Sequence, residues 1–180
     1  MFPNISAKTA GISAVISSLI VFFSIIILFL YTENFQLFGS WLSELGTSSY
    51  GQIFNFFLVV SAVFLLPFGI YMYRTLGRKG YMRALFLLTA GFLVLTGVFN
   101  GSFSFHRPIA YAFFAFASLS LLSIGWNLKN KFGAVTIILV VWCILGAPFI
   151  NPFIETVQAL VAIAWLFSAG VLAAWGYIKS

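Results

Sequence analysis

Six long apolar stretches occupy most of this 180-residue chain. A helix needs about 20 consecutive apolar residues to cross the roughly 30 Å hydrocarbon layer of a bilayer. The stretches cover residues 10–31, 52–73, 84–101, 108–127, 132–149 and 152–178. They lack the alternating polarity of a spanning strand, and a helix pairs its own backbone groups inside hydrocarbon. The sequence therefore predicts an all-α membrane protein, a bundle of six transmembrane helices forming a single domain over residues 1–180.

The amino-acid composition excludes most other classes of protein. Hydrophobic residues make up 62% of the chain and charged residues 7%, whereas a soluble domain averages about 45–50% apolar and about 25% charged residues. A water-soluble protein, a disordered chain and a nucleic-acid-binding protein are excluded on this ground, although the net charge is +6. We therefore expect membrane lipids as partners, together with membrane proteins that the sequence does not identify, and no nucleic acid.

The charged residues predict how the chain is oriented in the cell membrane. With a cytoplasmic N-terminus, every basic residue except Arg107 falls on the cytoplasmic side, as expected for short loops. These basic residues are Lys8, Arg74, Arg78, Lys79, Arg83, Lys129, Lys131 and Lys179. The three acidic residues, Glu33, Glu44 and Glu155, all fall outside. We therefore expect a multi-pass protein of the cell membrane with both termini inside.

The longest loop between the predicted helices, residues 32–51, has a sequence typical of a short amphipathic helix. Its apolar residues recur at helical spacing, and they are Phe38, Trp41, Leu42 and Leu45. Gly46 is a residue type that ends helices. Two interpretations stay open: an interfacial anchor with Trp41 at headgroup depth, or a lid that folds over the bundle and brings Glu44 to a site.

Polar side chains gather near the outer ends of the predicted helices, and the middle of every helix lacks charge. The candidate ligand-binding residues are Trp41, Ser43, Glu44, Asn55, Asn100, His106, Arg107, Glu155 and Gln158. Buried amides and charges are costly in hydrocarbon unless they are paired. We therefore expect these side chains to face one another inside the bundle, beneath the outer surface.

His106 and Arg107 carry the most chemical information. Arg107 precedes a predicted helix N-terminus, where the helix dipole disfavours a cation, so Glu44, Glu155, a lipid phosphate or a ligand carboxylate is expected to pair with it. His106 is either a hydrogen-bonded loop residue or a general base that Glu44 or Glu155 orients. No ligand spacing typical of a metal site is present, and one histidine cannot hold a haem from both sides. We expect no metal and no cofactor.

These residues support three functions from different classes. The favoured hypothesis is a small membrane protein, or an accessory subunit, that binds a lipid or other amphiphile in an outer-leaflet polar pocket. The second is an intramembrane lipid hydrolase or transferase, with His106, Glu44 and Glu155 as catalytic candidates. The third is a transporter of small solutes. The uncharged midplane and the lack of internal repeats disfavour transport, and the lack of known nucleophile or phosphate motifs disfavours an enzyme.

Several short segments resemble a known family. They are Trp41-Leu-Ser-Glu-Leu-Gly46, Phe54-Asn55, Gly97-Val-Phe99, and His106 before a stretch rich in Ala and Phe. On these segments the chain resembles the prokaryotic, often archaeal, membrane proteins known as domain of unknown function 998. The resemblance implies about six helices, with Ser43, Gly46, Asn55 and His106 as shared polar or small positions near one membrane face. Arg107 is not part of that pattern, and the family implies no activity.

Overall fold

The chain folds as an all-helical bundle. The structure is a computed structural model, and it describes residues 4–76, 80–128, 130–146 and 151–178. Within these ranges it contains no strand and the following helices: α1 (Ala7–Tyr31), α2 (Leu42–Leu45), α3 (Gly51–Thr75), α4 (Gly80–Val98), α5 (His106–Leu128), α6 (Lys131–Gly146) and α7 (Pro152–Ala174). The predicted all-α class is confirmed.

Five of these helices, α1, α3, α4, α5 and α7, are long and apolar enough to cross a membrane. The protein is therefore a multi-pass membrane protein. The sixth predicted span, residues 132–149, coincides with α6, whose 16 residues fall short of the about 20 that a full span needs. Its last predicted part, residues 147–149, lies outside the described residues. A sixth crossing thus stays a prediction.

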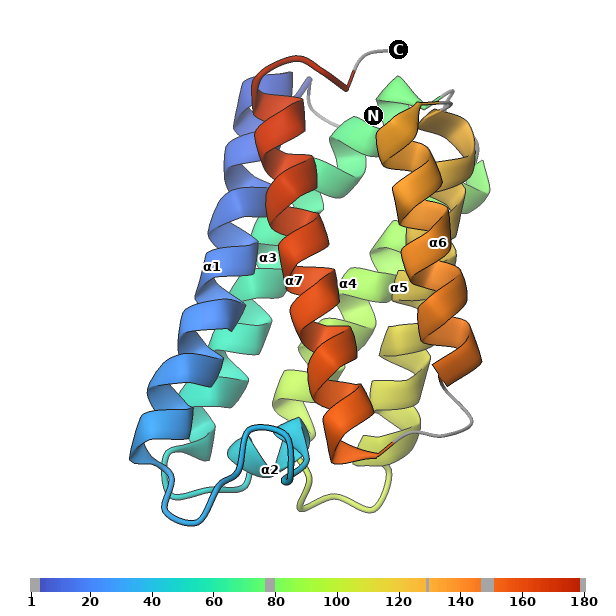
Figure 1. The fold of residues 1–180 in the computed structure, drawn as a ribbon. Helices are drawn as coiled ribbons and strands as arrows, with labels where there is room; N and C mark the ends of the chain where they lie inside the picture. The colour runs from blue at the N-terminus through green and yellow to red at the C-terminus, as the bar shows by residue number, and fades with distance from the viewer. Residues whose placement is uncertain (1–3, 77–79, 129, 147–150, 179–180) are drawn as a thin grey trace.

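The helices form an up-and-down bundle with two distinct ends. α1 packs against α3 and α7, and the chain then continues through neighbouring pairs from α3 to α6. Figure 1 shows both termini at one end of the bundle, here called the termini end, and α2 at the other, here called the α2 end.

The charged residues divide between these two ends, as the orientation argument requires. Lys8, Arg74, Arg83 and Lys131 belong to helix ends at the termini end. The basic residues Arg78, Lys79, Lys129 and Lys179 lie outside the described residues. The three acidic residues and Arg107 belong to the α2 end. Which end faces the cytoplasm remains a prediction.

The third predicted helix ends earlier than expected. α4 stops at Val98, whereas the apolar stretch runs to residue 101. The Asn100 side chain accepts a hydrogen bond from the Ser102 N–H at 3.1 Å, and this Asx-type turn competes with helix continuation. Gly101 therefore lies in the turn, so Gly97 and Gly101 do not share one helix.

The helix predicted in the first loop is also shorter than expected. Only Leu42–Leu45 is helical, because the N–H groups of Gly39 and Ser40 donate to the Gln36 carbonyl at 3.0 and 2.8 Å and form a turn instead. Phe38 belongs to this turn and is 48% exposed. The expected apolar face over residues 38–45 is thus reduced to Leu42 and Leu45, which are buried in the bundle.

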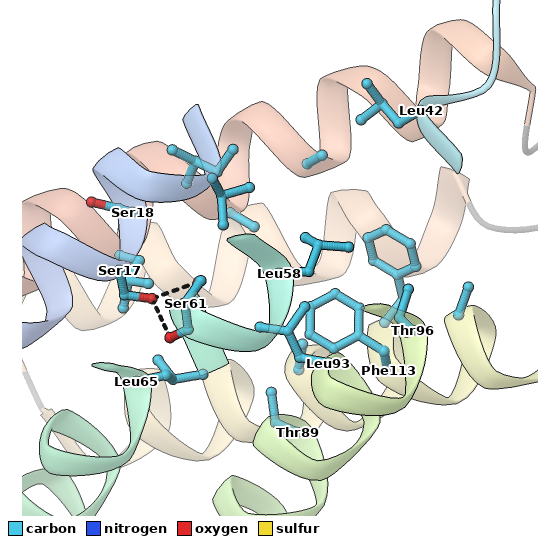
Figure 2. A pocket seen from close by; sticks show the side chains of 18 of the residues that line it. Ser17, Ser18, Leu42, Leu58, Ser61, Leu65, Thr89, Leu93, Thr96 and Phe113 are labelled. Carbon is cyan, nitrogen blue, oxygen red and sulfur yellow. Dashed lines mark hydrogen bonds between the residues drawn. The ribbon is translucent and has the colours of Figure 1, made fainter. Parts of the chain in front are cut away.

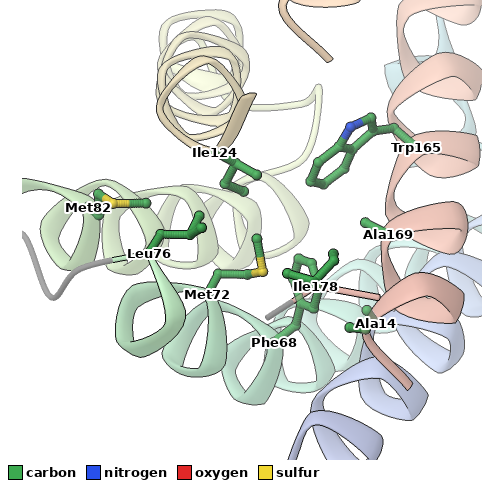
Figure 3. Packing of buried hydrophobic residues seen from close by; sticks show 10 residues of the cluster. Ala14, Phe68, Met72, Leu76, Met82, Ile124, Trp165, Ala169 and Ile178 are labelled. Atoms are coloured by element: carbon green, nitrogen blue, oxygen red, sulfur yellow. The ribbon is translucent and has the colours of Figure 1, made fainter. Parts of the chain in front are cut away.

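The interior of the termini end is densely filled. Figure 3 shows Phe68, Met72, Met82 and Ile124 converging between the helices, each at most 1% exposed. Dense packing of this kind leaves few voids. The core at this end therefore holds the helices together and leaves the space for a ligand to the α2 end.

Candidate functional site

An internal cavity of about 200 Å³ lies between α1, α3, α4, α5 and α7. It begins at Ser43, Asn55, His106 and Glu155 near α2, and most of its other walls are aliphatic and aromatic. An engineered apolar cavity of about 150 Å³ binds benzene. The internal cavity therefore has room for a segment of hydrocarbon chain.

A second hollow, here called the outer recess, adjoins this cavity at the α2 end. It measures about 580 Å³, and Trp41, Glu44 and Arg107 line it. The residues that line both spaces are Ser43, His106, Ala110, Phe114 and Glu155. A polar surface recess and an apolar interior thus share one wall, which is the arrangement that an amphiphilic molecule requires.

His106 begins α5 and lies in this shared wall with 5% of its surface exposed. Its Nδ1 is hydrogen-bonded to the Phe99 carbonyl. A carbonyl only accepts, so Nδ1 carries the proton and, in the neutral ring, Nε2 is an acceptor. Nε2 is buried and has no partner among the described residues. A buried polar atom without a partner is rare in folded proteins, which makes Nε2 the atom most in need of a ligand group.

Glu155 ties the first loop to α7. Its Oε2 accepts a hydrogen bond from the Leu42 N–H at 2.8 Å, and the neighbouring Thr156 hydroxyl donates to the Leu37 carbonyl at 2.8 Å. The segment that contains α2 is therefore folded across the end of the bundle and held there. Neither Glu155 nor Glu44 orients His106 in the described structure, because the Phe99 carbonyl occupies that position.

Asn55 and Gly46 join α3 to the α2 segment. The Asn55 Nδ2 donates to the Gly46 carbonyl at 3.0 Å. A Cβ added to Gly46 would lie 2.6 Å from the Asn55 Oδ1, and one added to Gly97 would lie 2.7 Å from the Asn55 carbonyl oxygen. A larger residue at position 46 would therefore displace the Asn55 side chain, and one at position 97 would push α4 away from the α3 backbone. These contacts bring together residues 46, 55 and 97 of the segments on which the family resemblance depends.

Arg107 lies in the outer recess, and of the four partners expected for it the two protein carboxylates are not used. It is exposed, and within the described ranges it has no hydrogen bond or ion pair to Glu44, Glu155 or any other side chain. Its guanidinium therefore faces the recess as an unpaired cation, available to an anionic group of a ligand.

Two of the candidate residues lie away from this arrangement. Asn100 closes the turn after α4. Gln158 is buried, and its Nε2 donates to the Cys143 carbonyl at 3.0 Å, which links α7 to α6. Although Gln158 is three positions after Glu155, it points to α6 while Glu155 points to α2. The remaining candidates line the outer recess or the cavity.

Two pairs of hydroxyl groups that line the cavity were not predicted. Ser17 and Ser61 join α1 to α3 with oxygens 2.9 Å apart (Figure 2). Thr89 and Ser120 join α4 to α5 at 3.0 Å. None of these four residues is charged, and the only sequence signal for them is serine and threonine recurring within apolar helices.

Trp165 closes the inner end of the cavity. Its indole N–H donates to the Thr136 hydroxyl at 2.7 Å, and its ring lies against Phe68 and Phe132 at centroid distances of 6.4 and 5.8 Å. These contacts hold the ring from α3 and α6. The cavity therefore ends at a rigid aromatic floor, above the packed core of the termini end.

Comparison with known proteins gives a family match and nothing more specific. A family model described as "Protein of unknown function (DUF998)" matches residues 15–175. No curated protein and no solved structure matches the chain. The match extends over α1 to α7 and includes every residue of the recess and the cavity discussed above.

Proposed function

The chain belongs to the DUF998 family of proteins of unknown function, and from that premise we propose that it binds an amphiphilic lipid at the α2 end. The polar head of the lipid lies in the outer recess and its hydrocarbon lies in the internal cavity. The observation that carries this proposal is the shared wall of Ser43, His106, Ala110, Phe114 and Glu155.

The depth of the cavity supports a ligand drawn from one leaflet. The residues that line the cavity extend from Phe86 to Thr96 on α4 and from His106 to Leu121 on α5, which is about 15–23 Å along a helix. One leaflet of hydrocarbon is about half of the roughly 30 Å layer, so the cavity is at least as deep as one leaflet. With the charge distribution described above, the proposal assigns the ligand to the outer leaflet of the cell membrane.

The electrostatics of the outer recess support a head group that carries a phosphate. Arg107 supplies an exposed cation there, and the buried His106 Nε2 has no protein partner. Phosphate oxygens and hydroxyl groups are good partners for both side chains. Glu44 and Glu155 in the same recess disfavour a second negative charge.

The test uses a lipid with one head group and one chain, 1-palmitoyl lysophosphatidylglycerol, added to the purified protein in dodecyl maltoside. Native mass spectrometry measures the bound fraction. Ala110→Trp fills the shared wall and is expected to weaken binding at least tenfold, while Ala84→Trp, on an exposed part of α4 away from these spaces, is the matched control. Equal binding to the wild type and both variants would contradict the proposal.

A lipid hydrolase or transferase is the second candidate, and the unpartnered Nε2 of His106 is the observation that favours it. His106→Asn keeps an N–H donor for the Phe99 carbonyl and removes the Nε2 acceptor. A binding protein carrying this change loses a few-fold in affinity, whereas an enzyme loses turnover altogether. Chromatography of the lipids after incubation with wild-type protein in nanodiscs distinguishes these outcomes, because a binding protein returns every lipid unchanged.

A further inference from the structure

A third space, here called the lateral groove, lies between α5, α6 and α7. It measures about 590 Å³ and is lined largely by apolar side chains, with Leu139, Val140 and Val161 among those that belong to it alone. Tyr111 and Leu119 in its lining are about half exposed. Because α5 and α7 are candidate membrane spans, the groove opens toward the hydrocarbon of the bilayer.

The lateral groove borders both spaces of the proposed site. It shares Ala117, Leu121, Ala162 and Trp165 with the internal cavity, and it shares Tyr111 with the outer recess. Phe114 lines all three. The recess, the cavity and the groove therefore meet at one aromatic side chain on α5.

The cavity and the groove run side by side along α5 and end at the same residue. On α5, the groove extends from Tyr111 to Leu121, ten residues or about 15 Å. The cavity begins five residues earlier, at His106, and also ends at Leu121, and Trp165 of α7 lines both spaces. Two apolar channels that start beneath one polar recess and end at one floor reproduce the shape of a head group with two chains.

We propose that the ligand is a two-chain lipid whose chains separate at Phe114, one entering the internal cavity and the other lying in the lateral groove. This inference rests on the proposed function and names its ligand class. The small side chains of Ala117 and Ala162, on α5 and α7, leave the cavity and the groove side by side. A lipid already in the bilayer therefore reaches the cavity sideways, without its chains passing through water.

The test compares two lipids with the same head group and the same palmitoyl chain, 1-palmitoyl-2-oleoyl phosphatidylglycerol and 1-palmitoyl lysophosphatidylglycerol. Native mass spectrometry in dodecyl maltoside is expected to give about tenfold tighter binding of the two-chain lipid. Ala115→Trp fills the groove alone and is expected to abolish this preference while leaving lysolipid binding within about twofold. Ala84→Trp is again the control, and thermal unfolding checks that each variant is folded.

The outcomes separate this inference from the proposed function. If the wild type binds both lipids equally, or if the preference survives in folded Ala115→Trp, the two-chain inference is wrong and the amphiphile site remains. If the wild type binds neither lipid, both proposals fail.

Photocrosslinking provides a measurement that does not depend on the groove variant. A diazirine-bearing two-chain phosphatidylglycerol, with a photoreactive group in each chain, is expected to label peptides containing Leu93, which lines the cavity only, and Leu139, which lines the groove only. Both labels are expected to fall in Ala110→Trp. Labelling of the groove that persists in this variant would identify lipid bound nonspecifically around the protein and overturn the inference.

Discussion

The two ends of the bundle use apolar helices in opposite ways. At the termini end, the buried side chains of Met72, Met82 and Ile124 pack into the interior (Figure 3). At the α2 end, the same helices surround a cavity whose walls carry paired hydroxyl groups. The comparison teaches that a hydrophobic helix can supply either packing or a lipid-sized space. The α2 end keeps a packed cluster beside its cavity, with Ile25, Leu28 and Leu45 fully or nearly fully buried.

Glycines at the two ends of the bundle make room for different neighbouring groups. A Cβ on Gly11 would lie 2.4 Å from backbone atoms of Gly170 and Ala174, so α1 and α7 touch along their backbones. At the α2 end, Gly46 makes room for the Asn55 side chain instead. Close backbone contact between helices thus occurs at both ends, because Gly97 also brings α4 against the backbone of α3. Only at the α2 end does a glycine, Gly46, also serve the attachment of the α2 segment.

The largest effect is expected where backbones touch at the filled end. Gly11→Leu forces α1 away from α7, and overpacking of this kind costs up to about 3 kcal/mol of unfolding free energy. Thermal unfolding in detergent, followed by circular dichroism, measures the loss. Gly91→Leu is the control, because a Cβ there meets nothing within 4 Å. Equal stability of the two variants would show that the α1–α7 contact is looser than described.

Removing side-chain volume distinguishes the filled end from the hollow end directly. Met72 is 0% exposed in the packed core, whereas Leu58 is 8% exposed and lines the cavity. Met72→Ala opens a new void in a packed core and is expected to cost about 3 kcal/mol, while Leu58→Ala enlarges an existing space and is expected to cost about 2 kcal/mol. Unfolding titrations with sodium dodecyl sulfate measure both. The reverse order would mean that the hollow end carries the stability.

The Asn55–Gly46 contact is expected to behave as one unit. Asn55→Leu removes the hydrogen bond and Gly46→Ala pushes the Asn55 side chain aside, so each costs about 1 kcal/mol. Because both changes break the same contact, the double variant should cost little more than either alone. The same unfolding titration, applied as a double-mutant cycle, measures this. Fully additive losses would show that the two residues act independently.

The smallest effect concerns the attachment of the α2 segment to α7. Glu155→Gln keeps an oxygen acceptor for the Leu42 N–H but weakens the bond, since a carboxylate accepts more strongly than an amide. Overall stability should change by less than about 0.5 kcal/mol. Hydrogen exchange of the Leu42 amide should accelerate a few-fold, with no change in Glu44→Gln. Unchanged exchange in Glu155→Gln would show that other contacts hold the segment.

Local physical chemistry made much of the fold predictable. Hydrophobicity over about 20 residues locates a membrane helix without reference to its neighbours, and the predicted ranges overlap α1, α3, α4, α5, α6 and α7. The predicted helix boundaries are wrong where hydrogen bonds of a local turn compete with continuation of the helix. Asn100 forms an Asx-type turn that ends α4 early, and Gly39 and Ser40 form a turn where the apolar spacing predicted helix.

Several residues of the candidate site could be predicted from the sequence, but the contacts that they make could not. His106, Asn55 and Glu155 line one cavity, as expected from the cost of exposing polar groups to hydrocarbon. The sequence alone did not separate Gln158 from Glu155, because a small rotation of α7 decides which neighbour each side chain meets. It also did not indicate that a main-chain carbonyl, that of Phe99, orients His106.

The sequence by itself determined that the chain is helical, that it belongs in a membrane, and that its polar residues lie mainly toward one end, because these properties follow from side-chain hydrophobicity summed along the chain. Only the tertiary structure decided that the interior is filled at one end and hollow at the other. The volume left between helices depends on how each helix is rotated and how closely its backbone approaches the next. Phe114 therefore marks the junction of three spaces only once α5, α6 and α7 are packed together.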